Sequence, residues 1–312
     1  MTNNRLVAQS TARTVQRAAM LVAIYVVLIF LLPANHADLR EHHLSLLQYR
    51  TILFAVSLPS LLTWLVAFAG YAKLREYVYL IRKSPEGAYF SKLAVGCAWL
   101  AWSLPLSAIL AFLLDGLANS WTGFYSSAVI ISNYSYMLLS LIALSIIGNA
   151  SRGLVNRARL KFSLASVRII MLLFLTAGVL YCYLTFRHFD LSSLSSTHNP
   201  YYLPIWLMVI SIIIPYLYAW FTGLLAAYEI HLFSRRTNGV LYRQALRLLV
   251  AGLITIILSS VAVQYVSSLQ PHVGQLTLGY QLVLVSVFRL IGGGGFLLLG
   301  LGAIRLKKIE EI

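Results

Sequence analysis

Residues 279–304 read GYQLVLVSVFRLIGGGGFLLLGLGAI, an apolar stretch broken by a single basic residue, Arg289. The hydrocarbon core of a bilayer is about 30 Å thick, and a helix needs about 20 apolar residues to cross it. Only helices and closed barrels satisfy all their backbone polar groups in lipid, so this stretch predicts a transmembrane helix. Seven other stretches have the same character. The expected spans are residues 18–34, 52–72, 93–114, 125–148, 166–186, 203–225, 246–268 and 279–304.

The composition indicates the same fold class, an all-α integral membrane protein with eight transmembrane helices. Apolar residues make up 60% of the 312 positions and charged residues 11%, against about 25% charged in soluble domains. The lipid bilayer is therefore the first partner that we expect.

The net charge of +15 is distributed unevenly along the chain. Twenty of the 24 Lys and Arg residues fall on one side of the expected spans, at the two termini, in every second connection, or within the first residues of the span that follows such a connection. The positive-inside rule then places both termini in the cytoplasm, which fits an even number of spans in the cell (cytoplasmic) membrane. Since topology accounts for the basic residues, no nucleic-acid partner is expected.

The two halves of the chain resemble each other. His36, Asp38 and Leu39 follow the first span, and the same pattern recurs 152 residues later as His188, Asp190 and Leu191. The offset of 152 also relates Leu80 to Leu232 and Gly87 to Gly239. A proline with a tryptophan five residues later recurs at an offset of 156, as Pro59 with Trp64 and Pro215 with Trp220. The difference of four residues is about one helical turn.

This pattern predicts a tandem duplication of a four-helix unit, residues 1–150 and 151–312. An even number of spans per unit makes the two copies face the same way, as a parallel (4+4) repeat. In transporters built from parallel repeats, the substrate site tends to lie between the halves near the bilayer midplane.

Arg289 is the strongly basic residue expected near the bilayer centre. An Arg at that depth costs from about 2.5 to over 10 kcal/mol unless it is paired or hydrated. The span 125–148 offers polar residues at matching depth, and we take Asn133, Tyr134 and Tyr136 with Arg289 as a candidate solute-binding set. Two interpretations stay open: a structural Arg satisfied by such groups, or a site for an anion or polar solute.

Glycines follow Arg289 directly, at Gly292, Gly293, Gly294 and Gly295. Consecutive glycines allow close approach of a neighbouring helix or a ligand to the backbone, and they also permit a hinge or a constriction. Pro59 and Pro215 each free a carbonyl within an expected span, so we count them among the positions of backbone approach or bending.

The duplicated His36, Asp38, His188 and Asp190 are weak candidates for a metal site or pH sensor, since imidazole and carboxylate groups bind zinc and His titrates near neutral pH. The Asp residues also suit helix capping, and His is tolerated at membrane interfaces. We therefore expect no metal and no cofactor.

Three functions remain in view. The first is a permease or channel-like protein for a small polar or anionic solute, with its path between the halves. The second is a non-catalytic membrane subunit or sensor that acts through a protein partner or as a homo-oligomer. The third, a membrane enzyme acting on lipid or quinone, lacks a recognisable catalytic constellation, so an enzyme is not expected.

Overall fold

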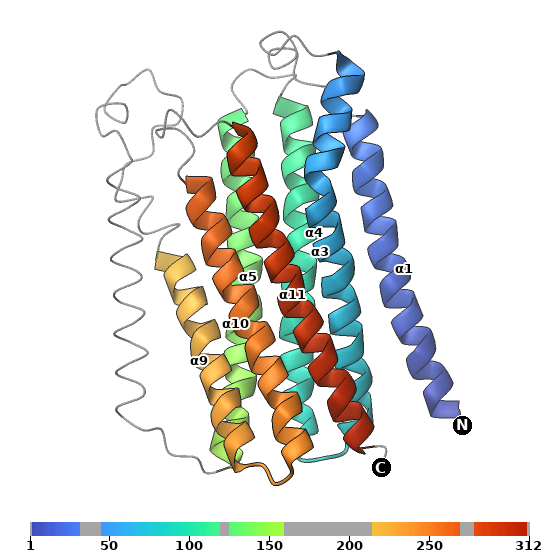
Figure 1. The fold of residues 1–312 in the computed structure, drawn as a ribbon, viewed down its shortest axis with the longest axis vertical. Coiled ribbons are helices and arrows are strands. Elements are labelled where there is room, and N and C mark those ends of the chain that lie inside the picture. Colours follow the sequence, from blue (N-terminus) through green and yellow to red (C-terminus); the bar gives the residue numbers. More distant parts are fainter. Residues whose placement is uncertain (1, 32–44, 119–124, 159–213, 269–277, 311–312) are drawn as a thin grey trace.

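In the computed structural model, the described residues are 2–31, 45–118, 125–158, 214–268 and 278–310, and within them the regular structure is entirely helical. The helices are α1 (Thr2–Leu31), α3 (Leu46–Ile81), α4 (Gly87–Ala118), α5 (Tyr125–Arg157), α9 (Ile214–Arg236), α10 (Val240–Ser268) and α11 (Leu278–Glu310) (Figure 1).

Five of these helices contain a segment long and apolar enough to cross a membrane: Thr11–Leu31, Gly87–Leu110, Leu138–Arg157, Val240–Val263 and Val283–Glu310. The chain is thus built as a helical membrane protein. Of the other expected spans, 52–72 lies within α3, 203–225 lies partly in α9, and 166–186 falls outside the described residues.

Among the described helices, six form a closed bundle. In the order α3, α4, α5, α9, α10 and α11, each helix packs against the next, and α11 returns to α3. Helix α1 packs against α3 at the edge of the bundle (Figure 1). Two of these contacts, α3 with α11 and α5 with α9, join the first part of the chain to the last.

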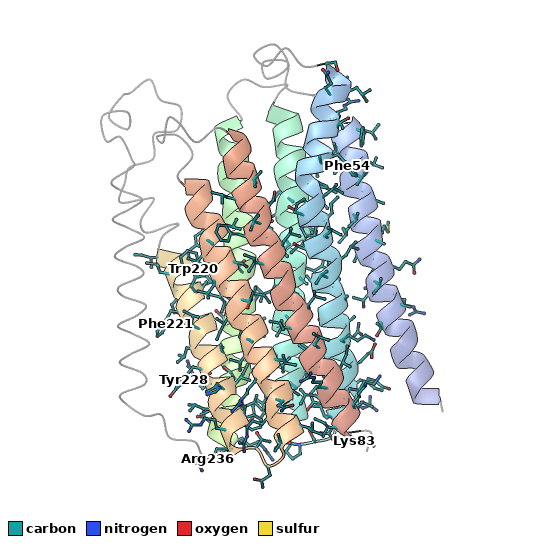
Figure 2. The ribbon with its side chains drawn as sticks, in the orientation of Figure 1. Phe54, Lys83, Trp220, Phe221, Tyr228 and Arg236 are labelled. Carbon is teal, nitrogen blue, oxygen red and sulfur yellow. The ribbon has the colours of Figure 1, made fainter. Side chains whose placement is uncertain are left out.

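The beginning of α1 and the end of α11 lie at the same end of the bundle, together with the α3–α4 and α9–α10 turns (Figure 1). Lys83 and Arg236, in or beside these two turns, lie there as well (Figure 2). We call this the basic end, because α5, α9 and α11 also finish there with Arg or Lys in their last turns.

The helix boundaries follow local chemistry. Ser45 begins α3 with a capping box: its hydroxyl accepts from the Gln48 backbone N–H at 3.2 Å, and the Gln48 side chain accepts from the Ser45 N–H at 2.9 Å. At the basic end, a Cβ on Gly87 would lie 2.1 Å from the Ile81 carbonyl oxygen, and Gly239 adopts a φ of 111°. Both turns therefore require glycine, which gives the sequence match between Gly87 and Gly239 a physical reason.

The buried interior combines aromatic side chains with small residues. Phe68 and Trp102 meet edge to face at 5.1 Å, and Tyr77 and Phe90 at 5.4 Å. Between helices, a Cβ on Gly70 would lie 2.4 Å from the Phe296 carbonyl oxygen. Small residues of this kind let backbones approach, and such packing drives helix association in lipid, where burial of apolar area gives no advantage.

The predicted division of the chain at residues 150 and 151 lies inside α5, which continues to Arg157. A connection between two units would therefore begin after Arg157.

Candidate functional site

Arg289 lies on α11, about 16 Å from the first residue of that helix. Its Nη1 donates to the hydroxyl of Ser60 on α3 at 2.6 Å, and Ser60 is itself buried. The hydroxyl of Thr63, also on α3, donates to the backbone carbonyl of Arg289 at 2.9 Å. Arg289 is therefore held to α3 through both its side chain and its backbone.

The local sequence of α3 explains these contacts. Ser60 and Thr63 are three residues apart, so they share one face of the helix. Thr63 also donates to the Pro59 carbonyl at 2.9 Å, one turn back, so its hydroxyl proton is shared between two carbonyls, one on each helix. Pro59 lies inside α3, and the helix continues through it.

The glycines after Arg289 are mostly used for packing. A Cβ added at Gly292 would lie 2.6 Å from the Ser259 hydroxyl, and one added at Gly293 would lie 3.2 Å from the Thr63 hydroxyl. A Cβ added at Gly295 would lie 2.7 Å from the Gly252 carbonyl oxygen. At Gly294 it would meet nothing within 4 Å. Because α11 runs unbroken through all four, these distances favour close packing over a hinge in this conformation.

The remaining predicted solute-binding residues, Asn133, Tyr134 and Tyr136, belong to α5, and their side chains are outside the described part of the structure. Helix α5 packs mainly on α4 and α9, whereas α11 packs mainly on α10 and α3. The described contacts bring Arg289 together with Ser60 and Thr63 on α3.

The other candidates are described only in part. Pro215 is the second residue of α9, and its side chain is not described. His36, Asp38, His188 and Asp190 lie outside the described residues. Within the described ranges, no group of three or more His, Cys, Asp and Glu residues is placed to hold a metal ion.

The structure reveals a charged cluster around Glu76, which the sequence reasoning missed. Glu76, 7% exposed near the basic end of α3, accepts from Thr11 on α1 at 2.8 Å, from Lys73 at 2.9 Å and from Lys307 on α11 at 3.2 Å. Burial by itself would raise the pKa of this carboxyl, but the hydrogen bonds from Lys73, Thr11 and Lys307 bring the pKa below its ordinary value. Glu76 thus joins three helices as a carboxylate.

A second buried acid, Glu229, lies between α9 and α5. It is 1% exposed, its Oε2 contacts the hydroxyl of Ser151, and its Oε1 lies 3.6 Å from the Nε of Arg152. Burial raises the pKa of Glu229, and the Ser151 hydrogen bond and the Arg152 charge offset only part of that rise. The two acids therefore have opposite pKa shifts.

The sequence itself contains a pattern that relates Glu76 to Glu229. Gly70 precedes Glu76 by six residues, Gly223 precedes Glu229 by six residues, and both pairs are related by an offset of 153. This offset lies between the 156 of the proline pair and the 152 of the Leu80 and Leu232 pair. Both glycines and both acids are buried.

The chain matches no family model, no curated protein and no solved structure.

Proposed function

We propose that this protein is a permease or channel-like protein for a small polar or anionic solute, with a path along the contact between two four-helix halves. The observation that carries the proposal is Arg289, a guanidinium on α11 that donates to Ser60 on α3 at 2.6 Å. The contact between α3 and α11 is one of the two that would join the halves.

The chemistry of Arg289 suits such a solute. A guanidinium carries five N–H donors in a fixed fork that fits carboxylate and phosphate groups. One of its nitrogens faces a neutral hydroxyl, and the side chain is exposed. An intramembrane Arg is costly, which makes it a functional hypothesis by default.

The proposed halves draw support from burial. Five buried positions of α4 have buried counterparts on α10 at the offset of 152 that the sequence suggested. These pairs are Leu93 and Ala245, Ala94 and Leu246, Cys97 and Leu249, Leu100 and Gly252, and Ala101 and Leu253.

The same offset relates buried positions of α5 and α11. These pairs are Ala143 and Gly295, Leu144 and Phe296, Ile147 and Leu299, Ser151 and Ala303, and Leu154 and Leu306. We therefore propose eight spans in two parallel copies, with both termini cytoplasmic and the basic end as the cytoplasmic face. The shared position of the two termini and of both glycine turns at that end fits this arrangement.

The test is solute flux in proteoliposomes that contain the purified chain, with inorganic phosphate, sulfate, chloride, lactate, serine and glycerol as solutes. We expect Arg289→Ala to abolish the flux of the anions that the wild type carries. Ser60→Ala should reduce it less, because it removes one hydrogen bond, worth about 1 kcal/mol. Arg305→Ala, an exposed arginine on the same helix, is the matched control. Unchanged flux of every transported solute in Arg289→Ala would remove Arg289 from the path.

One observation favours the second candidate, a non-catalytic subunit or sensor. The exposed side chain of Arg289 lies on α11 beside exposed Val287, Leu290 and Ile291, so a charged group sits on an otherwise apolar face, where lipid solvates it at high cost and a membrane partner would shield it. Affinity purification from the native membrane should then yield a stoichiometric partner, whereas a solitary monodisperse protein would count against this function.

A further inference from the structure

Glu229 is the most deeply buried carboxyl in the described part of the chain, with 1% of its surface exposed. It lies on α9 four residues beyond the expected span 203–225, so it is near the basic end. Its two carboxyl oxygens face different groups on α5. Oε2 contacts the Ser151 hydroxyl, and Oε1 lies 3.6 Å from the Arg152 Nε and has no hydrogen-bond partner among the described residues.

The Ser151 hydroxyl has one proton and two acceptors. Its Oγ lies 2.9 Å from the Gly148 carbonyl oxygen, one turn back on α5, and it also contacts Glu229. A backbone carbonyl only accepts hydrogen bonds. When Ser151 donates to Gly148, the contact with Glu229 needs a proton on the carboxyl. When Glu229 is ionised, Ser151 donates to Glu229 and the Gly148 carbonyl loses that donor.

Apart from Glu229 itself, the charged side chains and the histidine on α5, α9 and α10 are all basic. Helix α5 carries Arg152 and Arg157, of which Arg157 lies 3.5 Å from Glu86; α10 carries Arg243 and Arg247; and α9 itself carries His231, Arg235 and Arg236. Of these, Arg152 contacts Glu229, and its side chain is 54% exposed. The counter-ion of Glu229 is thus partly solvated, which weakens the ion pair.

Glu76 provides an internal comparison at the corresponding position of α3. It receives three hydrogen bonds, two of them from lysines, whereas Glu229 receives one hydroxyl contact and one distant guanidinium. The site on α3 is built for a carboxylate, and the site on α9 accommodates a neutral carboxylic acid as well.

We propose that Glu229 is a proton-binding site whose occupancy switches the α5–α9 contact between two arrangements. In the protonated form, Glu229 donates to Ser151, and Ser151 donates to Gly148. In the ionised form, the carboxyl O–H bond has broken, the proton has passed to water at the basic end, and the carboxylate pairs with Arg152 and accepts from Ser151. The ligand is a proton, so this inference goes beyond the proposed function and does not depend on any solute.

The test is infrared difference spectroscopy of the full chain in lipid nanodiscs, recorded between about pH 4 and about pH 9. A band from the stretch of a protonated carboxyl should titrate with a midpoint above about 4.3, the ordinary value for Glu. The band should vanish in Glu229→Gln, which keeps the side-chain volume, and should persist in Glu76→Gln. Isotope labelling of glutamate then separates it from aspartate bands.

Two more variants test the roles of the neighbours. Arg152→Gln removes a charge that favours the ionised form alone, so it should move the midpoint to higher pH. Ser151→Ala removes a hydrogen-bond partner of both forms, so it should move the midpoint less than Arg152→Gln does. A purely structural role of Glu229 would leave no titrating band to move. A band that survives Glu229→Gln in folded protein, or a midpoint at or below the ordinary Glu value, would overturn the proposal.

Discussion

At the scale of single residues, the two buried acids show how partners decide the state of a carboxyl. Glu76 and Glu229 are both nearly inaccessible to water, yet their pKa values shift in opposite directions. Two lysine ammonium groups and a threonine hydroxyl hold the first as an anion. The second has one hydroxyl contact and one arginine at 3.6 Å, and burial dominates.

This difference predicts that replacing Glu by Gln has opposite effects on the free energy of unfolding at positions 76 and 229. Because the folded-state pKa of Glu76 is lowered, Glu76 stabilises the fold above the ordinary Glu pKa, and this stability is lost as the pH falls through the folded value. At neutral pH, Glu76→Gln should therefore lower the free energy of unfolding by about 1–3 kcal/mol, nearer the lower figure because Lys73 and Lys307 are partly solvated.

For Glu229 the folded-state pKa is raised, so stability is complete at acid pH and is lost as the pH rises through that folded value. Glu229→Gln should equal the wild type at low pH and exceed its stability at alkaline pH. Thermal unfolding in detergent across a pH series measures both variants. Destabilisation by Glu229→Gln at alkaline pH would contradict the assigned direction.

At the scale of helices, the glycines of α11 act through their neighbours. Gly292, Gly293 and Gly295 each have atoms of another helix within 3.2 Å of a Cβ position, whereas Gly294 has open space. Packing of α11 between α10 and α3 thus uses three positions of a run that looks uniform in sequence.

This geometry predicts that Gly295→Ala and Gly294→Ala differ although they are adjacent. At Gly295 the new Cβ meets the Gly252 carbonyl oxygen and Ile256 at 2.7 Å, so overpacking should cost about 1–3 kcal/mol. At Gly294 the same change should be neutral or should stabilise by up to about 1 kcal/mol, because alanine favours helix over glycine. Unfolding in a denaturing detergent measures both, and equal effects would show that this packing is not what the glycines provide.

At the scale of the whole molecule, the distribution of charge and the arrangement of the helices agree. The α3–α4 and α9–α10 turns, the beginning of α1 and the end of α11 share one end of the bundle (Figure 1). Helices α5, α9 and α11 finish there with Arg or Lys in their last turns. In our proposed topology, this end faces the cytoplasm and Ser45, at the start of α3, faces the outside.

Cysteine labelling in intact cells tests this topology. In a background without Cys97 and Cys182, an impermeant thiol reagent should modify Ser45→Cys and leave Lys83→Cys and Asn238→Cys unmodified until the membrane is opened. All three positions are exposed. Labelling of Lys83→Cys but not Ser45→Cys would reverse the orientation, and different labelling of Lys83→Cys and Asn238→Cys would contradict parallel halves.

The sequence by itself determined the class of this protein, because the need to satisfy backbone groups in lipid leaves a long apolar stretch such as residues 279–304 little choice but a helix. It also matched Gly87 with Gly239, and both lie at turns that require glycine for a local reason: a Cβ at Gly87 would clash with the Ile81 carbonyl, and Gly239 has a positive φ. The closed order of the helices was decided only by the tertiary structure, because which helix packs on which depends on side-chain shape across helices distant in sequence. For the same reason, the contacts of Arg289 with Ser60 and Thr63 on α3 came from the tertiary structure and not from the sequence. The states of Glu76 and Glu229 depended on tertiary structure too, because a buried carboxyl takes its pKa from partners that folding brings to it.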